Sequence, residues 1–295
     1  MCHEGLRELV LETREFAQLL GDIRSDGQRI KGAIEQRLRL IGLQNQQEFL
    51  KTVTIQAAKI ADDSGRTTDA VLLYHLAEEY DNVITILNRT LSESLSLSIG
   101  SGGLRIEPLK PRSNDSTAAQ QNSSLSLTSV DDPVQLAKNM VAVYSSNAVL
   151  HRKISQANQE TCDVLLNMSA ARHFVETGKY KDALDTISGL SLLPTDADSN
   201  ITKIRQCAQN FNSLPPVIAR NVGNLLLWTI TCCSKLREEV MGSGFYGSDA
   251  TRQDIARRLV QQARDLMMFA GLVKFRLPAE VMEVLAREGS DVGSV

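Results

Sequence analysis

The chain has 295 residues, of which 42% are apolar and 23% are charged, and its formal net charge at pH 7 is −3. These values are typical of a folded soluble protein and exclude a disordered or membrane-embedded chain, while the mixing of basic with acidic residues argues against a nucleic-acid-binding surface. Aromatic residues make up only 4%, and aliphatic and long charged side chains dominate. This composition favours helices packed by aliphatic side chains over strands.

The cysteines and the N-terminus predict an intracellular protein. The number of cysteines is odd and their spacing is not that of a disulfide-bonded domain, which indicates a reducing compartment. The five cysteines are Cys2, Cys162, Cys207, Cys232 and Cys233. The first residues run into an amphipathic helix without the basic segment and apolar core of a signal peptide. The longest apolar run, Leu225 to Cys233, is far shorter than the roughly 20 residues that cross a bilayer. We expect no transmembrane segment.

Residues 1–92 predict four helices arranged as two antiparallel pairs. Apolar side chains recur at steps of three and four residues over 6–20, 30–41, 49–60 and 70–87. Gly21 and Gly42 follow the first two stretches as stop signals, and Ser25 with Gln28 forms a capping box before the second. Gly65 precedes the fourth helix, which we expect to be long and continuous through Leu87.

Residues 93–130 change to Ser, Gly, Asn, Gln and Pro, and predict a disordered insert. Such a segment buries too little apolar surface to offset the entropy lost on ordering it. The alternation Leu95, Leu97, Ile99 resembles a strand but has no predicted partner, so we interpret it as a helix tail or disorder. Deletion of residues 100–128 is accordingly expected to leave the melting curve nearly unchanged.

Helices resume in residues 131–288. Asp132 followed by Pro133 predicts a helix start, because the carboxylate can cap free amides and proline suits the first helical position. This helix is expected to reach His151, and the next runs through Cys162 to Gly178. The helix that ends at Gly178 and a short helix over 180–187 together form the helix–turn–helix unit of α-solenoids. The sequence lacks the strict period of tetratricopeptide repeats.

The remaining residues continue the same organisation. After a loop at 194–198, helices are predicted over 201–211 and, after Pro215-Pro216, through Leu225–Cys233. That run is apolar on every side, which predicts a central helix. A helix over 255–273 and a short one from Pro278 follow, and residues 289–295 form a disordered tail. The fold class is all-α, an irregular α-solenoid of stacked antiparallel helix pairs.

One segment matches a cofactor-binding motif in its residues but not in its predicted structural context. Residues 242–247, Gly-Ser-Gly-Phe-Tyr-Gly, fit the Gly-x-Gly-x-x-Gly phosphate-binding fingerprint. That loop must follow a parallel strand, whereas here it follows a predicted helix through Val240. We interpret it as an interhelix loop and keep nucleotide binding only as a remote alternative.

The other chemically versatile residues show no catalytic or metal-binding spacing. Cys232 and Cys233 are neighbours pointing about 100° apart on a helix, which favours core packing over metal ligation. The histidines are scattered: His3, His75, His151 and His173. His75 lies beside an apolar seam and is expected to be half-buried, and Asp62-Asp63 and Glu78-Glu79 suit solvated helix ends. The sequence predicts no catalytic, cofactor-binding or metal-binding residues, no cofactor and no enzyme, and leaves partner-binding residues unknown.

Three segments in order resemble a known family. They are residues 65–89, with Leu76-Ala77-Glu78-Glu79-Tyr80-Asp81; residues 211–233, with Leu214-Pro215-Pro216; and residues 263–281, with Phe269-Ala270-Gly271 and Arg276-Leu277-Pro278. Together they are similar to the nucleoporin-interacting-component family of inner-ring linker nucleoporins.

The resemblance implies an ancestral-coatomer-like solenoid, equivalent to the C-terminal part of those proteins, at the nuclear pore complex of the nuclear envelope. It also implies binding to other inner-ring nucleoporins, including a short linear segment of a membrane-associated linker nucleoporin, without nucleic acid. The alternative is a helical-repeat adaptor or coat subunit of another intracellular assembly, which the solenoid pattern alone would equally favour.

Overall fold

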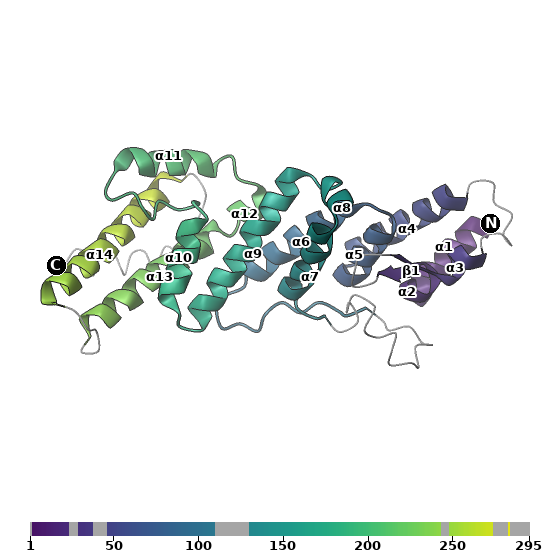
Figure 1. Cartoon of the computed structure of the whole chain (residues 1–295), viewed down its shortest axis with the longest axis horizontal. Helices are drawn as coiled ribbons and strands as arrows, with labels where there is room; N and C mark the ends of the chain where they lie inside the picture. Colours follow the sequence, from purple (N-terminus) through teal and green to yellow (C-terminus); the bar gives the residue numbers. More distant parts are fainter. Residues whose placement is uncertain are drawn as a thin grey trace. The chain divides into compact units, whose positions relative to one another are not determined.

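The computed structural model describes residues 2–23, 29–37, 46–109, 130–242, 248–273 and 283. Within these ranges the regular structure is helical apart from one antiparallel pair of short strands, which confirms the all-α prediction (Figure 1). The elements are α1 (Cys2–Thr13), α2 (Phe16–Leu19), β1 (Gly21–Ile23), β2 (Arg29–Lys31), α3 (Ala33–Arg37), α4 (Gln46–Asp63), α5 (Thr67–Leu76), α6 (Tyr80–Leu95), α7 (Pro133–Ser146), α8 (Ala148–Arg152), α9 (Gln156–Glu176), α10 (Tyr180–Gly189), α11 (Ile201–Phe211), α12 (Pro216–Ala219), α13 (Val222–Met241) and α14 (Asp249–Leu272).

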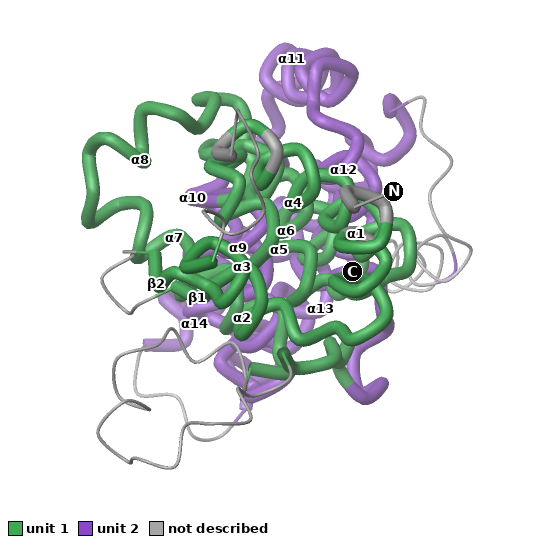
Figure 2. Tube along the Cα trace, turned by 90° about the vertical axis from the view of Figure 1, so that its right-hand side faces the viewer, with its two compact units in different colours: residues 1–94, 103–162 green, residues 95–102, 163–295 purple. Residues whose placement is uncertain are grey.

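The chain divides into two compact units, which Figure 2 colours separately. Residues 1–94 and 103–162 make up unit 1, and residues 95–102 and 163–295 make up unit 2. The sequence-based division at residues 93 and 131 follows composition, not contacts, and stays a prediction. Most of the predicted insert (110–129), the helix from Pro278 and the tail lie outside the described residues.

Helix α5 is the centre of unit 1. Its residues from Thr68 to Leu76 are all buried, and α4 packs along it while β1 contacts it from another side. A helix that is apolar nearly all round is stable only when neighbours cover every face. Three polar side chains of α5 are therefore also enclosed and need partners within the protein.

Three of the interhelix turns in the chain share one backbone geometry. Gly65, Glu78 and Gly178 have positive φ angles of 72°, 62° and 73°. In each turn the next amide donates to the carbonyl five residues earlier, with N–O distances of 2.9, 2.9 and 2.8 Å. This is the Schellman arrangement that ends a helix and satisfies its last carbonyls. The turns connect α4 to α5, α5 to α6 and α9 to α10.

The prediction of one long fourth helix through Leu87 is therefore wrong, because the turn at Glu78 separates two helices. Residues 67–76 form α5 and residues 80–95 form α6. The sequence signal was missing because a glutamate occupies the left-handed position that glycine usually fills.

The two N-terminal helices also differ from the prediction. The helix expected over residues 6–20 is interrupted at Arg14, whose φ is +55°. Residues 29–31 form a strand paired with 21–23, and only 33–37 of the expected second helix are helical in the described part. The cause is close backbone approach: a Cβ on Gly32 would lie 2.3 Å from the Leu19 carbonyl oxygen. The capping-box residues lie outside the described residues.

The expected helix start at Asp132 is confirmed. Its carboxylate accepts a hydrogen bond from the Val134 amide, and Pro133 occupies the first turn of α7. The helix ends before His151, because Asn147 adopts an extended conformation and caps the short helix α8 instead.

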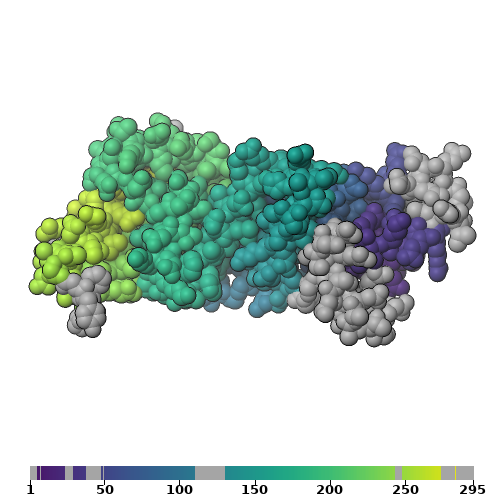
Figure 3. All heavy atoms as spheres, in the orientation of Figure 1, coloured from purple at the N-terminus to yellow at the C-terminus, as the bar shows by residue number. Residues whose placement is uncertain are grey.

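In unit 2, α13 has the central position that its apolar run predicted. Of residues 225–233, all except Leu227 and Thr231 are buried, and Trp228 is 2% exposed. Helices α10 and α14 pack against α13, and α11 packs against α14. Side chains close the gaps that the ribbon leaves around these helices (Figure 3). Within the described residues, no helix has both the length and the apolar character needed to cross a membrane.

Candidate functional site

The residues that could carry chemistry do not assemble into a reactive centre in the described part. Helix α13 precedes the glycine motif of residues 242–247 and α14 begins at Asp249, so the motif lies between helices, while residues 243–247 are outside the described residues. A dinucleotide-binding loop needs a preceding strand, which is not found there. No group of three His, Cys, Asp or Glu side chains with metal-binding geometry occurs among the described residues.

Two thiols of unit 2, those of Cys207 and Cys232, are held in their neutral form. Burial raises the pKa of Cys232 to about 12 and that of Cys207 to about 11. Because the thiolate is the nucleophile and metal ligand, these surroundings disfavour both reactivities. Cys232 and Cys233 are both buried, in agreement with the core-packing prediction.

His75 is fully enclosed, so the expectation that it is half-buried is wrong. It is 3% exposed, and its Nδ1 lies 3.1 Å from the hydroxyl of Tyr144 on α7. The two rings are stacked at a centroid distance of 5.7 Å, and Tyr80 of α6 contacts both rings edge-on. Burial raises the pKa of Tyr144 well above its usual value. This aromatic cluster joins α5, α6 and α7 within unit 1.

The consecutive acidic residues Asp62-Asp63 and Glu78-Glu79 contribute ion pairs between secondary-structure elements. Asp62 of α4 pairs with Arg89 of α6, and Glu79 pairs with Lys51 at 3.0 Å. Glu78 pairs with Lys153 at 2.7 Å, and this hydrogen bond lowers the pKa of the Glu78 carboxyl. Exposed pairs of this kind contribute roughly 0–1 kcal/mol each. They orient unit 1 elements but provide no acid and base facing one another across a cleft.

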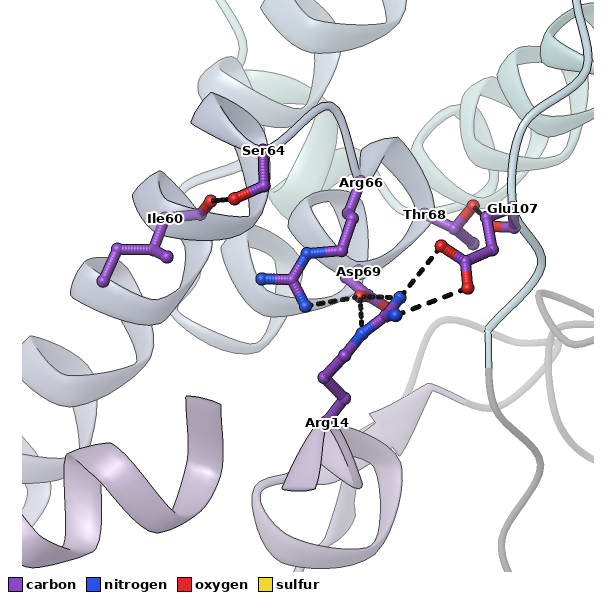
Figure 4. A network of polar contacts seen from close by, with 7 residues as sticks. All are labelled: Arg14, Ile60, Ser64, Arg66, Thr68, Asp69 and Glu107. Carbon is purple, nitrogen blue, oxygen red and sulfur yellow. Dashed lines mark hydrogen bonds and ion pairs between the residues drawn. The ribbon is translucent and has the colours of Figure 1, made fainter. Parts of the chain in front are cut away.

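The most enclosed charged cluster surrounds Asp69 of α5 (Figure 4). Arg14 donates to Asp69 Oδ2 through Nη2 at 3.0 Å and Nε at 3.3 Å, and Arg66 approaches the same oxygen at 3.5 Å. Arg14 also pairs with Glu107 at 3.1 Å, and Thr68 donates to the Glu107 carbonyl at 2.7 Å. Burial raises the pKa of Asp69, and the two arginines offset part of that rise. Every charge in the cluster has a partner, which is the signature of a structural junction.

This junction extends to the start of the predicted insert. Ile106, Leu109 and Val130 are buried, and the Ile106 amide donates to the Asp131 carbonyl at 2.9 Å. Residues 103–109 therefore pack on unit 1 beside the Arg14–Asp69–Glu107 junction, a contact that composition alone did not indicate.

A candidate binding surface is a groove between α13 and α14, about 850 Å³ in volume. A stripe of α14 lines it at helical spacing: Gln253, Ala256, Arg257, Val260, Gln261 and Arg264. Arg237 and Met241 line the opposite side from α13. The groove combines apolar side chains with arginines, which suits an amphipathic segment bearing carboxylates.

The charge of the groove is predominantly positive. Glu238, the one acid among the described residues that line it, pairs with Lys235 at 2.8 Å. Neither Arg237 nor Arg257 forms an ion pair with any residue that the structure describes. The opposite side of α14 is buried on its neighbours through Leu259, Leu266 and Phe269. Helix α14 thus carries one covered face and one open face.

Comparison with known proteins identifies a family. The Nup93/Nic96 family profile matches residues 1–284. "Nucleoporin NIC96" of Chaetomium thermophilum is 46% identical over 295 residues, which cover 99% of this chain and 26% of that protein. "Nucleoporin NIC96" of Saccharomyces cerevisiae is 39% identical, covering 97% of the chain and 31% of that protein. "Nuclear pore complex protein Nup93" of Xenopus tropicalis is 27% identical, with 94% and 30% covered.

A solved structure has the same fold. The crystal structure of Chaetomium thermophilum Nic96 SOL matches with a TM-score of 0.90 at 46% identity, over 97% of this chain and 40% of that one. The solenoid prediction is confirmed. The chain spans about a quarter to a third of the length of the curated relatives it matches.

Proposed function

Because the chain belongs to the Nup93/Nic96 family, we propose that it is a structural scaffold element of the nuclear pore complex. The observation that supports this most directly is the 46% identity with a nucleoporin over 99% of the chain, accompanied by the same helical fold.

The chain acts in this proposal by binding and not by catalysis. Unit 1 is built around a helix whose buried Asp69 is paired with arginine, and Asp62 of the neighbouring α4 is paired as well. Such an interior supports a rigid shape instead of substrate turnover. Its partners are other nucleoporins of the inner ring at the nuclear envelope, including a short linear segment of a membrane-associated linker nucleoporin.

Affinity capture from a nuclear-envelope extract tests the proposal. The purified chain is immobilised and its partners are identified by quantitative mass spectrometry. A Trp228→Asp variant is the matched control, because a charge at this 2% exposed position disrupts unit 2 while leaving surface composition almost unchanged. Enrichment of inner-ring nucleoporins on the parent chain over the control is the expected result.

Two other outcomes would contradict the proposal. Selective capture of vesicle-coat subunits would assign the chain to the alternative adaptor role. A rise in melting temperature with millimolar mononucleotides or dinucleotides would indicate a ligand site at residues 242–247 instead, since binding to the folded state stabilises it. We expect no such rise.

A further inference from the structure

The turn between α8 and α9 presents an exposed serine beside two basic residues. Ser155 lies directly before α9, and the exposed Arg152 and Lys153 precede it by three and two residues. Arg152 forms no ion pair with any residue of the described ranges. Basic residues at this spacing match the charge pattern that serine kinases with an acidic substrate cleft select. Helix α8 has five residues and none is buried, so extending this segment into a kinase costs little.

A carboxylate from another helix of unit 1 holds the serine. Asp81, in the first turn of α6, accepts hydrogen bonds from the Ser155 amide and the Ser155 hydroxyl, both at 2.9 Å. The same oxygen, Oδ1, accepts a third bond from Asn158 Nδ2 at 2.9 Å. Burial raises the pKa of Asp81, but the hydrogen bonds from Asn158 and Ser155 outweigh burial and hold it below its usual value. One charged oxygen thus fastens the start of α9 to α6.

We propose that Ser155 is a phosphorylation site and that its modification releases the start of α9 from Asp81. In the transfer, Ser155 Oγ bonds to the γ-phosphorus of ATP bound to the kinase, and the bond from that phosphorus to the leaving oxygen of ADP breaks. The hydroxyl proton passes to the catalytic base of the kinase. The product carries roughly 1.5 to 2 negative charges at pH 7, and Oγ no longer has a proton to donate to Asp81.

The charges around the turn favour this release. The new phosphate would lie where Oγ and Asp81 Oδ1 are now 2.9 Å apart, so the two anions repel one another. The positive end of the α9 dipole and the ammonium group of Lys153 attract the phosphate instead. Lys153 is held by Glu78 at 2.7 Å through an exposed pair, which is weak enough to exchange. The phosphate therefore replaces Asp81 at the start of α9, and α9 itself stays helical.

Phosphorylation of the full chain in solution tests the site. The purified protein is incubated with ATP and the catalytic subunit of cAMP-dependent protein kinase, and modified residues are located and timed by mass spectrometry. Ser155 should be phosphorylated, and Arg152→Ala should slow that reaction about tenfold or more, because a charged contact with the kinase is lost. Ser92 is an internal control, because Arg89 precedes it by three residues but Ser92 is only 1% exposed. Absence of phosphate on Ser155, or modification no faster than that of Ser92, would overturn the proposal.

Hydrogen–deuterium exchange tests the release. Exchange of the amides of residues 153–159 is measured before and after phosphorylation, in the parent chain and in Asp81→Asn. Asparagine is the matched variant, because its carbonyl still accepts a hydrogen bond and only the charge is removed. Phosphorylation should accelerate exchange about tenfold or more in the parent and far less in Asp81→Asn, since repulsion requires the carboxylate. No acceleration in the parent, or equal acceleration in both, would refute the release. Both measurements use the purified chain, so their outcome is independent of any role at the nuclear pore.

Discussion

Replacing Tyr144 by Phe removes the hydrogen bond between Tyr144 and His75, which links α5 to α7 in the aromatic cluster. The ring and its stacking on His75 remain, because only the hydroxyl 3.1 Å from His75 Nδ1 is removed. Removing one partner of a buried hydrogen bond costs about 1–3 kcal/mol, because the remaining group loses its contact without regaining water. Since both residues are at most 3% exposed, water cannot replace the hydroxyl.

We therefore expect the free energy of unfolding to fall by about 2 kcal/mol. For a cooperative unit of this size, the melting temperature should drop by about 4–8 °C. The assay is urea unfolding followed by circular dichroism, with calorimetry for the melting temperature. Tyr180→Phe is the control, because the Tyr180 hydroxyl has no partner among the described residues, and it should change stability by less than about 0.5 kcal/mol.

A double-mutant cycle with His75→Leu completes the test. If the hydroxyl stabilises the fold through His75, the two substitutions should couple by about 1 kcal/mol or more. A Tyr144→Phe variant as stable as the parent, or a coupling energy near zero, would refute the reasoning.

Further measurements probe other parts of the structure. Gly32→Ala should destabilise the chain by about 2 kcal/mol or more in urea unfolding, because its Cβ would overlap the Leu19 carbonyl, whereas Gly189→Ala meets no atom within 4 Å and should be neutral. Trp228→Ala should cost about 3–5 kcal/mol in the same assay by leaving a cavity in unit 2. Deletion of residues 100–128 should lower the melting temperature, contrary to the sequence-based expectation, because it removes the buried side chains of Ile106 and Leu109; an unchanged melting curve would show that these contacts add nothing. Burial raises the pKa of Tyr74, Tyr80 and Tyr144 above the usual value of 10, so the unfolded chain releases protons that the folded chain keeps, and stability should be lost as pH rises above about 10. Tyrosinate absorbance should then rise together with unfolding.

Local signals in the sequence were sufficient for several elements. The Asp132-Pro133 start of α7 depends on one side chain and one ring, and both act within a single turn. The central place of α13 followed from a run that is apolar on every side. Gly65 and Gly178 marked two of the three left-handed turns.

Contacts between residues far apart in the sequence could not be predicted from local sequence signals. Arg14 is separated from Asp69 by 55 positions and from Glu107 by 93, so no periodicity connects them. The strand at 29–31 depends on the backbone at Leu19 lying against Gly32, which is again a tertiary contact. The turn at Glu78 could not be predicted for a similar reason, because packing around it holds a residue other than glycine in a left-handed conformation.

The candidate groove was likewise not predictable residue by residue. The sequence marked α14 as a helix through its buried side, and it left partner-binding residues unknown. Recognising the second stripe required knowing that Leu259, Leu266 and Phe269 are buried, whereas Val260 lines the groove and Met268 is exposed. Periodicity defines stripes on a helix, and only packing decides which stripe is covered.

The position of α5 has a consequence for synthesis on the ribosome. Its turns with α4 and α6 close through contacts five residues apart, so this helical hairpin can form within microseconds of emerging. The hydroxyl that completes the His75 cluster belongs to residue 144, and translation at about 5–20 residues per second delivers it about 3–14 s after residue 76. During those seconds the most buried helix of unit 1 lacks α7. Nascent chains of this protein should therefore need a chaperone most while residues 77–144 are being made.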